Sequence, residues 1–242
     1  RGQAREGEHA RGAGRGDGVD KRVADVGTRQ VGRGEASGSY YLGETPETMA
    51  AELRAITPAI DDNLAAAAIQ EMLPPGGARN ALDCAFWDLR AKLAGRRVWE
   101  FLDLEPEPLT TVYTLGIDTP RLRAEQAAAA GRYRRLKIKL DGNAPVEKIE
   151  AIRAVRKDAE LIVDANQAWS MDELRDYAPH FQRLGIGMIE QPLARGQDES
   201  LEGYRSPVPL GADESCLHLG EFEAAARRYD VLNIKLDKCG GL

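Results

Sequence analysis

Cysteine and histidine are scarce in this sequence. Its 242 residues include three of each, at positions Cys84, Cys216, Cys239, His9, His180 and His218. The cysteines lack the close spacing of zinc-binding or redox motifs, so the sequence predicts neither a zinc site nor a disulfide framework. An odd and sparse cysteine count favours a reducing, cytoplasmic location. The histidines are scattered along the chain, and we interpret them as incidental.

Long apolar runs and an excess of basic charge are absent as well. The best apolar run, LAAAAI at 64–69, is far shorter than the roughly 20 residues that span a bilayer, so no membrane partner is predicted. The formal net charge of −6 argues against a general nucleic-acid-binding surface. A chain of 242 residues, 43% of them hydrophobic, is long enough to bury a large core.

Large apolar side chains are missing from the first 39 residues. Residues 1–39 contain no Leu, Ile, Met, Phe, Tyr or Trp, and they are rich in Gly and Arg. Neither the apolar period of a strand nor that of a helix emerges. Since such a composition buries little apolar surface, we expect residues 1–39 to be a poorly ordered or aberrant N-terminal segment.

Helical patterns begin after Tyr40. Thr45 followed by Pro46 is a good helix start, because proline suits the first helical position, and this helix should run to about Ile56. We expect a second helix over about 60–72 and a third over about 78–93, with Gly95 closing the third. The apolar face of the third helix consists of Leu82, Ala85, Phe86, Leu89 and Leu93. Residues 40–108 are therefore predicted to be a helical subdomain.

Short apolar runs recur regularly in residues 109–242. Their centres lie roughly 22 to 26 residues apart, about one strand, one helix and two loops. The runs are TVYTLGI (111–117), RLKIKL (135–140), LIVDAN (161–166), GMIEQP (187–192), PLGADE (209–214) and VLNIKL (231–236). Near-continuous apolar strands favour a parallel sheet covered by helices, and the absence of a phosphate-loop motif favours a (β/α) barrel. Because such a barrel closes with eight strands, we expect an incomplete barrel of strands one to six, and a natural protein that continues beyond it.

Polar residues stand where the predicted strands end, and the active sites of such barrels lie at these ends. The residues are Lys137, Lys139, Asp164, Glu190, Asp213 and Lys235. Three carboxylates, Asp164, Glu190 and Asp213, come from three consecutive strands and should converge. Crowded carboxylates repel one another, and a divalent cation relieves that repulsion. Because the candidate ligands are all oxygens, the pattern predicts Mg²⁺, with Mn²⁺ as the alternative, rather than zinc.

The two strand lysines suggest acid–base chemistry. In an eight-stranded barrel, strands two and six lie on opposite sides, so Lys139 and Lys235 would face each other across the mouth. This arrangement suits removal of a proton from one face of a carbon and its return to the other face. If that carbon lies next to a substrate carboxylate, a cation bound to this carboxylate would stabilise the enediolate that forms when the proton leaves.

Simpler interpretations exist for each residue taken alone. A single strand-end aspartate is usually a loop or helix cap, and a single strand lysine is usually ion-paired or extended toward water. Asn166 and Glu214 could be loop hydrogen-bonding residues or partners of a lysine. The functional interpretation depends on the recurrence of acids and lysines at the same end of five successive strands.

Several motifs resemble the enolase superfamily, in its muconate-lactonizing subgroup, and are closest to dipeptide epimerases of the L-Ala-D/L-Glu epimerase type. They are KIK (137–139), DAN (164–166), IEQP (189–192), DES (213–215) and NIKLDKCGGL (233–242). The resemblance implies an α/β fold in which an α+β capping domain precedes the barrel, with 40–108 as the helical part of that domain. It also implies that Asp164, Glu190 and Asp213 are metal ligands, and that Lys139 and Lys235 are acid/base residues. By the same resemblance, Lys137 and Thr114 contact the substrate.

The resemblance thus implies a Mg²⁺-dependent isomerase, a racemase or epimerase that acts on a small carboxylate, most simply a dipeptide. A muconate cycloisomerase, an o-succinylbenzoate synthase and an N-acylamino acid racemase remain alternatives, because they share the same lysines and ligands. An inactive fragment is the alternative outside enzyme chemistry. Whether the chain forms a homo-oligomer is left open.

Overall fold

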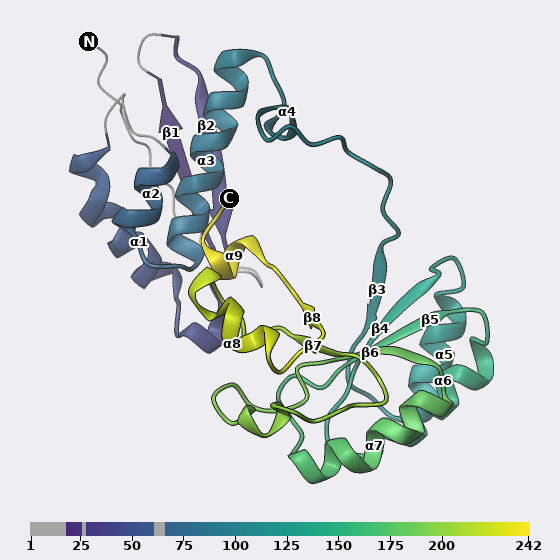
Figure 1. Cartoon of the computed structure of the whole chain (residues 1–242). Helices are drawn as coiled ribbons and strands as arrows, with labels where there is room; N and C mark the ends of the chain where they lie inside the picture. Colours follow the sequence, from purple (N-terminus) through teal and green to yellow (C-terminus); the bar gives the residue numbers. More distant parts are fainter. Residues whose placement is uncertain (1–17, 26–27, 61–65) are drawn as a thin grey trace. The chain divides into compact units, whose positions relative to one another are not determined.

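The computed structural model describes residues 18–25, 28–60 and 66–242. The chain divides into two units, each of which is described by itself (Figure 1). The N-terminal unit comprises the chain through Glu107 together with Ile234–Leu242, and the sheet unit comprises Pro108–Asn233. Among the described residues, no helix is long and apolar enough to cross a membrane.

The N-terminal unit contains an antiparallel strand pair. Strand β1 (Val19–Ala24) pairs with β2 (Val31–Ala36), and both pack against helix α3 (Gly77–Ala94). The expectation that residues 1–39 are poorly ordered is therefore wrong for the part of that segment that the structure describes. Residues 1–17 lie outside the described residues.

Small residues on β2 explain how this pair packs without large apolar side chains. The buried positions of β2 are Gly32, Gly34 and Ala36. A Cβ atom on Gly32 would overlap the carbonyl oxygen of Ala85, and one on Gly34 would overlap that of Ala81, both on α3. The strand thus lies against the backbone of the helix itself, and glycine is required for that close approach.

The helices of this unit follow the sequence pattern. Helix α1 (Pro46–Ile56) is capped by Thr45, as predicted, and α3 ends at Gly95 in a left-handed conformation, also as predicted. Leu82, Ala85 and Leu89 are buried, but Leu93 is exposed, so the predicted apolar face of α3 is wrong at its last residue. The remaining short helices are η1 (Tyr40–Leu42), η2 (Thr57–Ala59), α2 (Ala66–Met72) and α4 (Val98–Phe101).

The last residues of the chain pack on α3. Helix α9 (Leu236–Cys239) is followed by Gly240 and Gly241, both with positive φ. The buried guanidinium of Arg79 donates to the carbonyl oxygens of Cys239 and Gly240, and the Leu242 N–H donates to Asp83 at 2.9 Å. Residues Ile234–Leu242 therefore belong to the N-terminal unit, although the sequence pattern assigned them to the barrel.

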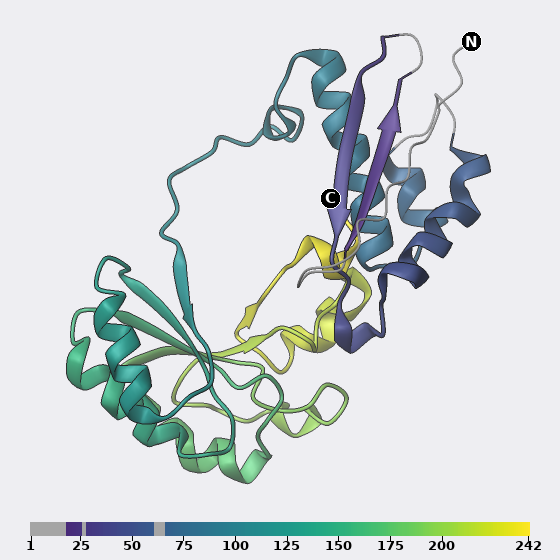
Figure 2. The same ribbon diagram turned by 180° about the vertical axis from the view of Figure 1, so that it is seen from behind.

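The sheet unit is a parallel sheet whose strands follow one another in chain order. The strands are β3 (Val112–Leu115), β4 (Arg135–Lys139), β5 (Glu160–Asp164), β6 (Ile186–Glu190), β7 (Leu210–Ala212) and β8 (Val231–Leu232). The connections contain α5 (Pro120–Ala129), α6 (Pro145–Val155), α7 (Met171–Arg183), η3 (Glu199–Leu201), η4 (Leu219–Glu221) and α8 (Phe222–Ala226). Figures 1 and 2 show α5, α6 and α7 on one face of the sheet. Each predicted run overlaps a parallel strand, which confirms the α/β prediction.

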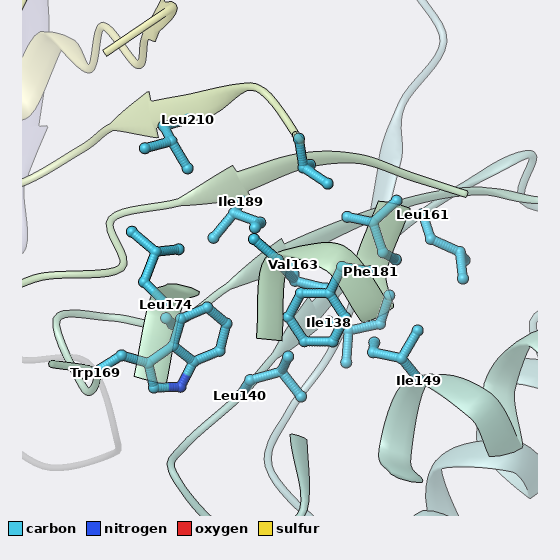
Figure 3. Packing of buried hydrophobic residues seen from close by; sticks show 14 of the residues in the cluster. Ile138, Leu140, Ile149, Leu161, Val163, Trp169, Leu174, Phe181, Ile189 and Leu210 are labelled. Atoms are coloured by element: carbon cyan, nitrogen blue, oxygen red, sulfur yellow. The ribbon is translucent and has the colours of Figure 1, made fainter. Parts of the chain in front are cut away.

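The core of the sheet unit lies between these helices and one face of the strands. Alternate strand residues such as Ile138, Val163 and Ile189 are fully buried there, and they pack with Phe181 of α7 (Figure 3). Because side chains alternate along a strand, the residues between them lie on the other face of the sheet. That other face carries the polar residues Lys139, Asp164 and Glu190.

Candidate active site

Three of the predicted site residues form one row across the sheet. In the strand register, Lys139 of β4 pairs with Asp164 of β5, and Asp164 pairs with Glu190 of β6. All three end their strands, so the parallel register brings their side chains to the same edge. Lys137 lies two residues before Lys139 and therefore lies on the same face, one step nearer the middle of the sheet.

The lysines of β4 contact the carboxylates of this row directly. Lys137 Nζ lies 2.9 Å from Asp164 Oδ2 and 2.8 Å from Glu190 Oε2. Lys139 Nζ lies 2.8 Å from the same Asp164 oxygen and 2.6 Å from Asn166 Oδ1. Two ammonium groups thus share one buried carboxylate.

Burial makes these charges strongly dependent on their partners. Burial tends to lower the pKa of Lys137, but the charge of Asp164 and the hydrogen bonds that Lys137 donates to Glu190 and Asp164 outweigh it, so the pKa is raised. Burial raises the pKa of the Glu214 carboxyl, and the neighbouring charges of Asp213 and Asp164 raise it further. Lys137 therefore stays positively charged. The negative charges of Asp213, Asp164 and Glu214 lie close enough to repel one another.

The other two strand ends complete the same edge. Asp213 follows β7 directly and is 2% exposed, and its neighbour Glu214 is equally buried. Asn233 follows β8, and its Nδ2 donates to Glu190 Oε1 at 2.9 Å. Glu190 is therefore held from both sides, by Lys137 and by Asn233.

Thr114 and Lys235 lie outside the row of Lys139, Asp164 and Glu190. Thr114 is exposed on β3, where it pairs in register with Lys137. Lys235 was predicted to lie within the last strand, and this is wrong because β8 ends at Leu232. Lys235 has an extended conformation at the start of α9, in the N-terminal unit. The apolar neighbours Ile234 and Leu236 that suggested a strand are exposed.

Three further residues take part in the site, and the sequence pattern assigned no role to two of them. Asn166 accepts from Lys139, which confirms the interpretation of it as a lysine partner. Asn233 binds Glu190, and the side chain of Gln191 binds the backbone of the loop after β7. Each of them directly follows or closely follows a predicted strand end, so position along the strand was the only available signal.

The residues present suit a hard divalent cation. Within the described part of the chain, no three acidic, histidine or cysteine side chains are gathered closely enough to coordinate an ion. The donors nevertheless have the right chemistry, because Asp164, Glu190, Asp213 and Glu214 are buried and present carboxylate oxygens. The Oε2 atom of Glu214 is buried without a hydrogen-bond partner. A divalent cation would stabilise these buried carboxylates and satisfy that oxygen.

Comparison with known proteins identifies the family of this chain. The family profile described as Enolase C-terminal domain-like matches residues 121–242. The L-Ala-D/L-Glu epimerase of Escherichia coli (strain K12) is 38% identical over 214 residues, which cover 87% of this chain and 67% of the relative. The N-acetyl-D-glutamate racemase of Pseudoalteromonas sp is 42% identical over 170 residues, which cover 70% of this chain and 54% of the relative. The chain thus spans between about half and two thirds of these relatives.

A solved structure has the same fold. The dipeptide epimerase from Enterococcus faecalis V583, complexed with Mg and the dipeptide L-Leu-L-Tyr, superimposes with a TM-score of 0.85 at 28% sequence identity. The match covers 93% of this chain and 68% of that chain. It spans most of the sheet unit and of the N-terminal unit.

Proposed function

We propose, given that this chain belongs to the enolase superfamily, that it is a metal-dependent epimerase that acts on dipeptides. The observation that carries this proposal is the row of Lys139, Asp164 and Glu190 at the strand ends, with the Lys139 ammonium 2.8 Å from a fully buried carboxylate. The names of the relatives support the reaction class and the dipeptide.

We assign the acid/base roles to Lys139 and Lys235. One lysine, as the free amine, takes the proton from the carbon next to the substrate carboxylate, and the other, as ammonium, returns a proton to the opposite face. The position of Lys139 beside Asp164 and Asn166 supports its role, since two acceptors hold its Nζ atom in place. The match of residues 233–242 to the family motif supports the role of Lys235.

We assign Asp164, Glu190 and Asp213 to the cation, with Mg²⁺ as the preferred ion and Mn²⁺ as a substitute. Bound there, the cation would stabilise the negative charge that develops on the substrate carboxylate. Lys137 adds a second, fixed positive charge on the same face. Thr114 pairs in register with Lys137, which supports its assignment as a substrate contact. None of the three cysteines forms a disulfide bond, which supports a cytoplasmic location.

A racemase of N-acylated amino acids is the second candidate. The observation that favours it is the 42% identity to an N-acetyl-D-glutamate racemase. In both substrates, the α-carbon that loses its proton carries a carboxylate and an amide nitrogen. The row of lysine and carboxylates therefore serves either one, and the two candidates differ only in what binds the rest of the substrate.

Deuterium exchange tests the proposal directly. The full chain is incubated with Mg²⁺ in deuterated water with a dipeptide library and, separately, with N-acetyl amino acids, and mass spectrometry detects α-deuterium. We expect deuterium in one or more dipeptides, and none when Asp164→Asn replaces the wild type. Exchange in N-acetyl amino acids alone would favour the racemase, and exchange in neither class would refute both.

A further inference from the structure

Gln191 has an unusual environment for an uncharged side chain. It is fully buried, directly follows Glu190, and has a left-handed backbone conformation with φ 38°. A residue other than glycine holds this conformation only where its surroundings fix it. The fixing contacts are made by both ends of its amide.

The amide oxygen of Gln191 serves the loop after β7. It accepts the backbone N–H of Asp213 at 2.9 Å and that of Ser215 at 3.0 Å. These two N–H groups flank Glu214, so a single oxygen sets the direction in which the chain leaves the strand. The side chain of Asp213 extends from the backbone that this contact holds.

The amide nitrogen anchors the same side chain on the other side. It donates to Leu193 O at 2.8 Å, to Ser215 Oγ at 2.7 Å and to Tyr229 OH at 3.2 Å. The Tyr229 hydroxyl in turn donates to the buried carboxylate of Asp198 at 2.8 Å. The Gln191 amide is therefore unable to turn, because turning would leave buried donors and acceptors without partners.

We propose that Gln191 is a positioning residue for the cation site, one that sets the place of Asp213 relative to Glu190. This inference rests on the proposed function, because it takes Asp213 to be a cation ligand. Glu190 and Gln191 are consecutive, so the backbone that carries one carboxylate also carries the amide that fixes the backbone of the other. Partners behind metal ligands typically contribute about tenfold to a hundredfold in metal affinity.

The test compares Mn²⁺ affinity among variants of the full chain, measured by the EPR signal of free Mn²⁺, with thermal unfolding measured alongside. Gln191→Met removes both ends of the amide, and we expect Mn²⁺ to bind about tenfold to a hundredfold more weakly. Gln191→Glu keeps an oxygen for the two N–H groups and should bind Mn²⁺ more tightly than Gln191→Met. Equal losses in these two variants would overturn the inference.

Arg156→Met is the matched control for stability. Arg156 is also a buried hydrogen-bonding centre of the sheet unit, and it donates to the carbonyl oxygens of Ala127, Ala130 and Tyr133. We expect this variant to unfold at a lower temperature with unchanged Mn²⁺ affinity. If its Mn²⁺ affinity falls as far as that of Gln191→Met, the effect of Gln191 is general destabilisation and the inference is wrong.

Asp213→Asn separates this inference from the proposed function. If Asp213→Asn weakens Mn²⁺ binding and Gln191→Met does not, the positioning role fails and the proposed function stands. If Asp213→Asn binds Mn²⁺ as the wild type does, the ligand role itself fails, and the inference with it. If both weaken binding, the double variant should bind no worse than Asp213→Asn alone, and fully additive losses would show that Gln191 does not act through Asp213.

Hydrogen exchange supplies a measurement that needs no variant to fold. The N–H groups of Asp213 and Ser215 should be protected in the wild type, because Gln191 accepts both. Exchange of these two groups as fast as exposed loop residues would overturn the inference.

Discussion

Lys139 Nζ lies 2.8 Å from Oδ2 of Asp164, an atom that Lys137 Nζ also approaches to 2.9 Å. Asp164 is fully buried, so its charge is stabilised only by groups of the protein. A buried carboxylate with two ammonium partners is a demanding arrangement, since the loss of one partner leaves an uncompensated charge. This arrangement makes Asp164 the most informative residue of the site to replace.

Asp164→Asn should remove Mg²⁺ binding and epimerase activity together. The asparagine keeps the shape of the side chain but loses the charge that a cation requires, and we expect activity to fall by about a thousandfold or more, because metal stabilisation of the reaction is worth several kcal/mol. Isothermal titration with Mg²⁺ and the deuterium exchange assay measure the two effects. Glu190→Gln should behave in the same way.

Asp172→Asn is the control for this pair of variants. Asp172 lies in the first turn of α7 and its side chain is 93% exposed, so its replacement should change neither Mg²⁺ affinity nor activity. Native Mg²⁺ affinity in Asp164→Asn or Glu190→Gln would remove that residue from the proposed ligands.

Gly34→Ala should destabilise the N-terminal unit. A Cβ atom at this position would overlap the carbonyl oxygen of Ala81, so β2 and α3 would have to move apart. Overpacking of this kind typically costs about 1–3 kcal/mol. Thermal unfolding of the full chain, followed by hydrogen exchange over 19–36, should show the loss and place it in this strand pair.

Gly116→Ala is the control, because nothing lies within 4 Å of the added methyl group and its φ is not in the left-handed region. It should leave the unfolding temperature nearly unchanged. If Gly34→Ala is tolerated equally well, the close approach of β2 to α3 is not a source of stability.

The parallel strands and several helices could be predicted because their signals are local. Pro46 begins a helix where the sequence analysis expects one, and each apolar run overlaps a strand. The recurrence of acids and lysines at strand ends was enough to predict the row of Lys139, Asp164 and Glu190. Neighbouring parallel strands pair in a regular register, so residues at the ends of adjacent strands lie side by side whatever their side chains are.

The features that the sequence did not predict correctly have different physical causes. Two of the buried residues of β2 are glycines. Because glycine has no side chain, this strand lacks the alternating apolar side chains by which a half-buried strand is recognised in a sequence. Around Lys235, alternating Ile234 and Leu236 imitate a strand although both are exposed. Gln191 was missed because its importance comes from hydrogen bonds to residues more than twenty positions away, which local patterns do not encode.

The Asp141–Lys148 pair should make stability depend on pH. The hydrogen bond from Lys148, at 2.6 Å, holds the pKa of Asp141 below its ordinary value of 3.8. A carboxyl whose pKa is lowered on folding stabilises the protein above its unfolded pKa, and this contribution is lost as pH falls through the folded pKa. Asp141→Asn should therefore lower stability at pH 7 and leave it nearly unchanged well below pH 3.

Denaturant unfolding of both proteins at several pH values measures this difference. Since the Asp141 side chain is 38% exposed, solvent screening keeps the effect small, on the order of 1 kcal/mol. Asp176→Asn, an exposed residue of α7, serves as the control and should follow the wild type. An Asp141→Asn curve parallel to that of the wild type at all pH values would contradict the prediction.

The two proposed acid/base lysines should each govern one stereoisomer. If Lys139 and Lys235 act on opposite faces of the α-carbon, replacing either one abolishes epimerisation in both directions, because the proton is no longer delivered to its face. The remaining lysine still removes a proton from the isomer that it faces. In deuterated water, Lys139→Ala should exchange the α-proton of one isomer only, and Lys235→Ala that of the other.

The rates should be lowered, because losing one positioned acid or base typically costs about 10²- to 10⁴-fold. Lys157→Ala, which replaces an exposed lysine of the sheet unit, should exchange both isomers at the wild-type rate. The assay uses each isomer separately and follows deuterium by mass spectrometry and configuration by chiral chromatography. If both variants exchange the same isomer, or if either still interconverts the two, the lysines do not act from opposite faces. A reaction with a single base, as in a cycloisomerase or a synthase, would then explain the site better.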